Sequence, residues 1–83
     1  MGRLINIGYG NMMNTDRIVA VINPDSAPAK RIIGRSKETE VLIDATQGRK
    51  TKSIIVTDTD RIVLSALLPE TIAGRMSSDP LKE

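Results

Sequence analysis

Apolar residues occur along this chain in short runs that predict a mixed α and β protein. Runs rich in isoleucine, valine and leucine, bounded by glycine, proline, asparagine or aspartate, are typical of strands. Two other segments space their apolar residues three and four positions apart, as one face of a helix requires. The expected strands are residues 3–7, 17–22, 40–46, 51–57 and 61–67, and the expected helices are residues 27–36 and 69–76.

Both predicted helices carry start signals. Ser26 is a suitable N-cap for the first helix, with Pro28 in its first turn, and Pro69 starts the second. The residues expected to face the core are Ala29, Ile32 and Ile33 in the first helix and Ile72, Ala73 and Met76 in the second.

These elements predict an α+β fold: a small, mostly antiparallel sheet of about five strands with two short helices. We expect a single domain over residues 1–76, followed by a flexible tail over residues 77–83. Residues 18–22 and 62–68 are apolar on both strand faces, as expected where a sheet is covered on both sides. Two short helices can cover only one face of a five-stranded sheet, which would leave a large apolar surface exposed. The sequence therefore predicts self-association that buries this surface.

Composition narrows the possible functions. The 83 residues include no cysteine and no histidine, which removes thiolate metal sites, disulfides and the usual general base near neutral pH. No residue pattern indicates catalysis, a metal or a cofactor, and we expect a non-enzymatic protein. No apolar stretch is long enough to span a bilayer, and residues 1–10 lack a signal-peptide pattern, so a cytoplasmic location is expected.

Three short motifs have structural interpretations. Gly8-Tyr9-Gly10 follows a strand but lacks the third glycine and the helix of a dinucleotide site, which favours a turn. Asp58-Thr59-Asp60 lacks the remaining ligands of a calcium loop and predicts a hairpin turn. Lys52 and Ser53 are neighbours along a strand, so they point to opposite faces and do not form a nucleophile pair.

The candidate chemistry lies in a basic turn over residues 47–52, between two predicted strands. Gly48 can adopt the positive φ of a tight turn, and Arg49, Lys50 and Lys52 project from it. Residues 30–52 carry seven cations against three acids, although the whole chain has a net charge of only +2. Such a cluster on a stiff turn suits phosphate binding; a solvated hairpin tip that keeps strand edges apart is the alternative.

Other cations have less specific settings. Arg17 opens an apolar strand beside Asp16, so it could cap that strand through an Asp16–Arg17 pair, bind phosphate or lie at a subunit interface. Lys30, Arg31 and Arg35 belong to the first predicted helix, where they form either a solvated face or secondary DNA contacts.

Several segments together resemble one protein family. They are Ile5-Asn6-Ile7-Gly8-Tyr9-Gly10-Asn11, Asp25-Ser26-Ala27-Pro28-Ala29-Lys30-Arg31, Leu42-Ile43-Asp44-Ala45-Thr46-Gln47-Gly48-Arg49-Lys50-Thr51, Leu64-Ser65-Ala66 and Pro69-Glu70-Thr71. Across about residues 3–76 they resemble the RemA family (extracellular matrix regulatory protein A), small bacterial DNA-binding regulators. That resemblance implies an intracellular activator of biofilm-matrix genes that binds DNA on the surface of a ring-shaped homo-oligomer.

The resemblance also implies functional positions. The family's Gly-Arg-Arg turn falls on Gly48-Arg49-Lys50, its arginine after the first loop on Arg17, and its helix-opening proline on Pro28. Lys50 keeps the charge of the family's second arginine but loses its bidentate geometry. With the resemblance, duplex DNA is the expected partner of Arg49, Lys50, Lys52 and Arg17. The alternative function is an oligomeric scaffold whose basic loops bind an acidic protein.

Overall fold

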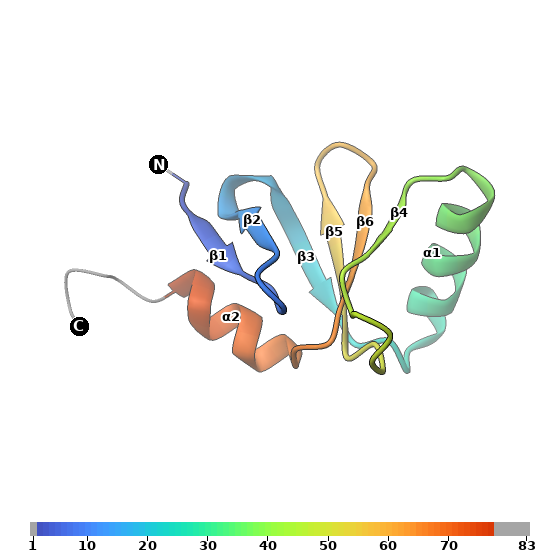
Figure 1. The fold of residues 1–83 in the computed structure, drawn as a ribbon. Helices are drawn as coiled ribbons and strands as arrows, with labels where there is room; N and C mark the ends of the chain where they lie inside the picture. The colour runs from blue at the N-terminus through green and yellow to red at the C-terminus, as the bar shows by residue number, and fades with distance from the viewer. Residues whose placement is uncertain (1, 78–83) are drawn as a thin grey trace.

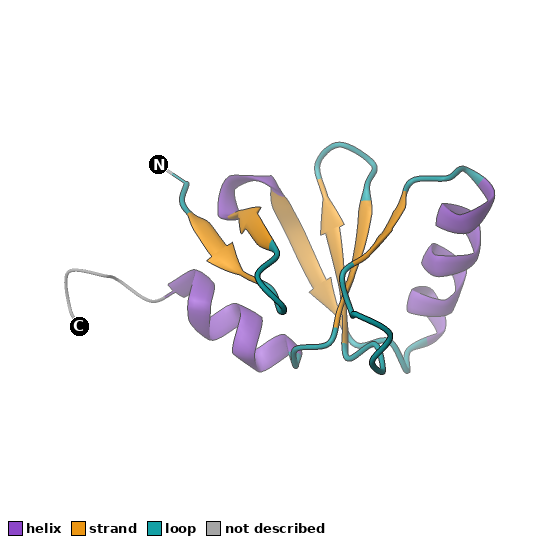
Figure 2. Ribbon diagram, viewed as in Figure 1, coloured by secondary structure: helices purple, strands orange, loops and turns teal. Residues whose placement is uncertain are grey.

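The computed structural model of the protein describes residues 2–77 and has a four-stranded sheet at its centre (Figures 1 and 2). Across the sheet the strands are β3 (Ile18–Ile22), β5 (Ser53–Thr57), β6 (Ile62–Ser65) and β4 (Leu42–Asp44). The β3–β5 and β5–β6 pairs are antiparallel, whereas β4 runs parallel to β6. The expected α+β fold with a mostly antiparallel sheet is therefore confirmed.

The N-terminal strand does not join this sheet. β1 (Leu4–Asn6) pairs with β2 (Met12–Asn14) in a separate two-stranded sheet, and a 3₁₀ turn, η1 (Thr15–Arg17), leads into β3. The prediction of one sheet of about five strands is wrong in this respect, whereas the second predicted strand is β3, which begins one residue after Arg17. β2 has only three residues, too few to show an alternating pattern.

The helices cover opposite faces of the central sheet (Figure 1). Along β5, Ile54 packs in a cluster with Ala29 of α1 (Ala27–Glu38), and the next residue, Ile55, packs in a second cluster with Ile72 of α2 (Pro69–Ser77). Neighbouring strand residues point to opposite faces, so the two clusters lie on the two sides of the sheet. The β1–β2 hairpin shares the α2 side, where Ile5 and Ile7 join the cluster.

This arrangement removes one premise of the predicted self-association. The sequence argument assumed that both helices lie on one face, whereas α1 covers one face and α2 with the hairpin covers the other. Strand β6 is thus buried along its whole length, whereas β3 is only half-buried and its Val19 is exposed. Large apolar side chains still exposed include Leu4 and Val19, and Val19 is 65% exposed at a register shift in edge strand β3. Self-association itself stays a prediction.

The helix start signals are confirmed. The hydroxyl of Ser26 accepts a hydrogen bond from the backbone N–H of Ala29 at 3.3 Å, and Pro28 lies in the first turn of α1. Ala29 is buried and Ile32 and Ile33 are partly buried, as predicted. α1 ends at Glu38, two residues beyond the predicted end, where Thr39 is the C-cap and Glu40 adopts a positive φ of 59°.

The second helix differs from its prediction in two respects. Ile72 is fully buried and Met76 packs against the same cluster, but Ala73 is exposed, contrary to the expected inward face. Ser77 is the last residue of α2 rather than the first of a tail, and residues 78–83 lie outside the described residues.

Within residues 2–77, no helix combines the length and the apolar character that crossing a bilayer requires.

Candidate nucleic-acid interface

The basic turn is part of a crossover connection. β4 and β5, which it joins, are not neighbours in the sheet because β6 lies between them. The connection therefore passes the end of β6 before entering β5. The alternative of a hairpin tip between two paired strands is wrong, since β4 pairs with β6 in parallel.

Local hydrogen bonds fix the start of the turn. The backbone N–H and the hydroxyl of Thr46 both donate to the Asp44 carboxylate, at 2.9 and 2.6 Å. The Arg49 N–H then donates to the Thr46 carbonyl at 3.0 Å. Gln47 and Gly48 have φ of 54° and 75°, so the predicted positive φ at Gly48 is confirmed. The turn thus has a defined backbone despite its exposed side chains.

The hydrogen bond from the Thr46 hydroxyl, followed by that from the Thr46 N–H, lowers the pKa of Asp44 below the ordinary aspartate value of 3.8. Asp44 is consequently ionised at neutral pH. Its negative charge lies at the start of the basic turn, where it is engaged by Thr46.

Two buried serines anchor the end of the turn. The Lys52 N–H donates to the Ser65 carbonyl at 2.8 Å, and the Ser65 hydroxyl donates to the Ile7 carbonyl at 2.7 Å. The Ser53 hydroxyl donates to the Leu67 carbonyl at 2.6 Å. Both serines are fully buried. Sequence reasoning considered Ser53 only as a nucleophile candidate and missed both anchors, because their partners lie far away in the chain.

The cations of the turn are available to a ligand. Arg49, Lys50 and Lys52 are all exposed. Within residues 2–77 the single ion pair joins Arg17 and Asp58, so the three turn cations have no carboxylate within ion-pair distance there. A positive surface held on a fixed backbone suits a polyanion.

The structure also brings two acids to this end of the molecule. Asp25, before α1, and Glu70, in the first turn of α2, line a hollow of about 380 Å³ together with Lys50 and Lys52. No sequence pattern predicts this proximity, because the acids lie 25 residues before and 20 residues after Lys50. They make the surface around the two lysines mixed in charge, whereas Arg49 does not line the hollow.

Arg17 lies away from the basic turn. Its guanidinium pairs with Asp58 at 3.2 Å, so the intrachain Asp–Arg pair considered as one alternative is present, but with Asp58 instead of Asp16. Asp58 belongs to the β5–β6 turn, at the opposite end of β5 from Lys52 (Figure 1). Five strand residues span roughly 15 Å. Arg17 and the turn cations therefore do not form one cluster within a subunit.

The α1 cations occupy an exposed surface. Lys30, Arg31 and Arg35 are all exposed, and Lys30 lies in the N-terminal part of α1, at the end of the molecule that carries the basic turn (Figure 1). Arg35 lines a different hollow, of about 540 Å³, with Asp60 of the β5–β6 turn. The N-terminal end of α1, which carries Lys30, and the β5–β6 turn beside Arg35 therefore lie at opposite ends of the sheet.

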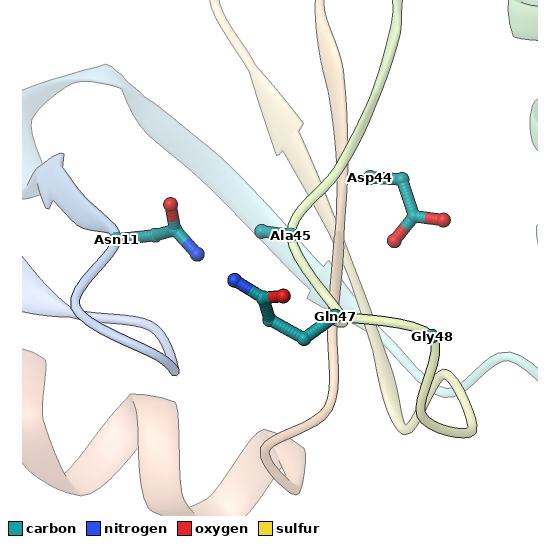
Figure 3. Close-up of a pocket in the computed structure, with 5 residues that line it drawn as sticks. All are labelled: Asn11, Asp44, Ala45, Gln47 and Gly48. Carbon is teal, nitrogen blue, oxygen red and sulfur yellow. The ribbon is translucent and has the colours of Figure 1, made fainter.

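A small polar hollow separates the basic turn from the first hairpin. Asn11, Asp44, Ala45, Gln47 and Gly48 line about 300 Å³ of space. Figure 3 shows the side-chain amides of Asn11 and Gln47 directed toward each other across it. The β1–β2 hairpin and the basic turn therefore border one surface. Among the described residues, no group of three or more acidic, histidine or cysteine side chains could hold a metal ion.

Comparison with known proteins identifies the family. The family model described as "RemA-like: Extracellular matrix regulatory protein A-like" matches residues 4–76. The protein belongs to this family. The predicted resemblance to RemA is therefore confirmed over nearly the whole chain.

Similar RemA-like proteins occur in several bacteria. A relative from Alkaliphilus oremlandii is 57% identical over 76 residues, which cover 92% of this chain and 82% of the relative. One from Moorella thermoacetica is 55% identical over 80 residues, covering 95% and 88% of the two chains. Both carry the name "Putative regulatory protein". The family match includes the basic turn and every described strand, so the turn belongs to the RemA-like domain. A regulatory role agrees with these names.

Proposed function

We propose that this protein is a DNA-binding transcriptional regulator that holds duplex DNA through the basic turn. The observation that carries the proposal is the turn itself: three exposed cations, Arg49, Lys50 and Lys52, on a hydrogen-bonded backbone at one end of the sheet. The regulatory names of the RemA-like relatives support the same class of function.

Affinity would come from repetition. Three clustered cations on one subunit are too few for tight duplex binding at physiological salt. A ring of subunits presents the turn many times, and each contact raises the effective concentration of the next. Sequence preference would then come partly from the deformability of the DNA that follows the ring.

The remaining cations have different places in this proposal. Lys30 and Arg31 are exposed in the N-terminal part of α1 and would add secondary phosphate contacts. Arg17 lies at the other end of β5, so a DNA contact by Arg17 would meet a different part of the duplex, or act beside the turn of a neighbouring subunit. Lys50 contacts phosphate as a point charge, without the bidentate geometry of the arginine that the family carries there.

Family membership also suggests a biological setting. The resemblance to the RemA family implies a regulator that activates biofilm-matrix genes inside the cell. As part of the proposal, we extend that role and a cytoplasmic location to this protein.

A gel-shift assay beside a light-scattering measurement tests the proposal. The wild-type protein should shift duplex DNA and show a mass several times the monomer's 9.0 kDa. Changing Arg49 and Lys50 to Ala should abolish the shift and leave the mass and thermal midpoint nearly unchanged, because exposed side chains contribute little to folding. Glu38→Gln on α1 is the control.

Three results would count against the proposal. Loss of the oligomer in the double variant would make the turn a contact between copies. A wild-type oligomer that ignores DNA but captures an acidic protein would favour the scaffold alternative. A monomeric wild-type protein would remove the avidity argument.

A further inference from the structure

The β1–β2 turn exposes the one aromatic side chain of the protein. Tyr9 is the single tyrosine, and the sequence has no tryptophan or phenylalanine. Tyr9 is 52% exposed to solvent. It also has φ of 55°, in the left-handed region that non-glycine residues rarely adopt. Tyr9 is therefore unfavourable for the isolated fold in two ways, through backbone strain and through an exposed ring.

The surrounding hydrogen bonds hold Tyr9 in this conformation. The Ile7 N–H donates to the Asn11 carbonyl at 2.8 Å, and the Asn11 N–H donates to the Gly8 carbonyl at 3.0 Å. The Asn6 side chain accepts from the Gly8 N–H at 2.7 Å. The turn is thus closed on both sides of Tyr9, which fixes the place of its exposed ring on the surface.

Ser65 joins this turn to the basic turn. The Ser65 hydroxyl donates to the Ile7 carbonyl, immediately before the Tyr9 turn, and the Ser65 carbonyl accepts from the Lys52 N–H. Both turns are consequently attached to the same end of β6. Asn11, two residues after Tyr9, and Gln47 of the basic turn also line one hollow, so the two turns border the same surface (Figures 1 and 3). A duplex held on Arg49, Lys50 and Lys52 would pass beside Tyr9.

We propose that Tyr9 is a further DNA contact, in which its ring packs against sugars and base edges beside the phosphates held by the basic turn. This inference rests on the proposed function. A tyrosine ring combines an apolar body with a polar tip, which suits a groove edge lined by sugars and phosphates. The contact would be rigid, because the turn already holds the backbone before DNA arrives.

Two variants separate this role from a structural one. Asparagine tolerates the left-handed conformation, so Tyr9→Asn should keep or raise the thermal midpoint. It should weaken duplex binding about tenfold, the loss expected for one aromatic contact. Tyr9→Phe keeps the ring and should bind within about threefold of the wild type. Leu4→Asn removes another exposed apolar side chain of the hairpin and is the matched control.

The salt dependence of binding distinguishes the contribution of the Tyr9 side chain from that of the cations. Tyr9 is uncharged, so Tyr9→Asn should leave the slope of log affinity against log salt unchanged. Arg49→Ala should reduce that slope by about 0.9 per lost phosphate contact in each subunit.

Tyrosine fluorescence reports on the same contact directly. With no tryptophan and one tyrosine, the emission of the protein comes from Tyr9 alone. Adding duplex DNA should quench this emission in the wild type and in Leu4→Asn to the same extent. Wild-type binding without quenching, or Tyr9→Asn binding as tightly as the wild type, overturns the inference and leaves the proposed function standing. A smaller mass in Tyr9→Asn also overturns it, since Tyr9 would then join copies. A wild type that binds no DNA ends both proposals.

Discussion

The hydroxyl of Ser65 donates a 2.7 Å hydrogen bond to the carbonyl of Ile7, 58 residues earlier in the chain. The same hydroxyl accepts from the Leu67 N–H at 3.1 Å. Ser65 and Ile7 are buried, whereas the bond from the Leu67 N–H is only partly buried. A single small side chain thereby holds the β1–β2 hairpin against the end of β6.

Ser65→Ala should destabilise the protein by about 1–3 kcal/mol, because it leaves the buried Ile7 carbonyl and the partly buried Leu67 N–H without their partner. Urea unfolding of the wild type and variant measures the difference. Ser77→Ala is the control: that hydroxyl is exposed and bonds a carbonyl of its own helix, so the change should be close to neutral. Equal midpoints for Ser65→Ala and the wild type would show that the hairpin docks by apolar packing alone.

The Arg17–Asp58 pair should contribute little to stability. Its side chains are 62% and 41% exposed, and exposed pairs are screened by solvent and salt. A double-mutant cycle with Arg17→Ala and Asp58→Ala should give a coupling energy below about 1 kcal/mol. A DNA-binding loss in Arg17→Ala could then not be explained by unfolding. A coupling energy well above this range would make the pair a structural element.

The pair also shows where sequence reasoning stops. Asp16, the neighbour in sequence, is the partner that one of the sequence alternatives names, but η1 directs Arg17 toward a turn 41 residues away. Signals carried by a few adjacent residues gave correct predictions, such as the Ser26 cap, the positive φ of Gly48 and the hairpin turn at residues 58–60, where the Thr57 N–H bonds the Arg61 carbonyl. Local chemistry fixes such features almost independently of the rest of the fold.

Features set by tertiary packing were missed. Whether residues 3–7 join the main sheet depends on the Gly8–Gly10 turn, which folds the strand back on residues 12–14. This pairing places the hairpin on one face of the central sheet, and the apolar pattern within either strand does not reveal it. The basic turn was found because its cations are adjacent in sequence. The sequence does not reveal that Asp25, Glu70, Ser53 and Ser65 lie next to the basic turn. Elements distant in sequence bring these residues to it.

Asp44 should make stability depend on pH in the acid range. Its folded pKa is lowered, so its contribution is fully present above the ordinary value of 3.8 and is lost as the pH falls through the folded pKa. Asp44→Asn keeps an acceptor oxygen but not the charge. The stability difference between wild type and variant should therefore be largest near neutral pH and vanish at strongly acid pH.

Thermal unfolding across this pH range measures the effect, and NMR titration of the Asp44 carboxyl carbon gives the pKa directly. Thr46→Val removes the hydroxyl donor and keeps the N–H, so it should raise the pKa of Asp44 part of the way toward 3.8. An unchanged pKa in Thr46→Val would mean that the hydroxyl bond contributes little.

Salt and duplex length together test whether affinity comes from repeated contacts. If several subunits each neutralise one or two phosphates, six or more contacts should give a log–log salt slope steeper than about −5. A duplex of about one helical turn, roughly 10 base pairs, should reach one subunit and bind far more weakly than a longer duplex.

Lys50→Arg is the matched variant for this experiment. It restores the bidentate group at one contact without changing the number of contacts. Binding should therefore tighten modestly while the dependence on duplex length stays the same. Equal affinity for short and long duplexes, with a salt slope near −2, corresponds to about two phosphate contacts and means that each subunit binds alone. Assembly would then serve some purpose other than DNA affinity.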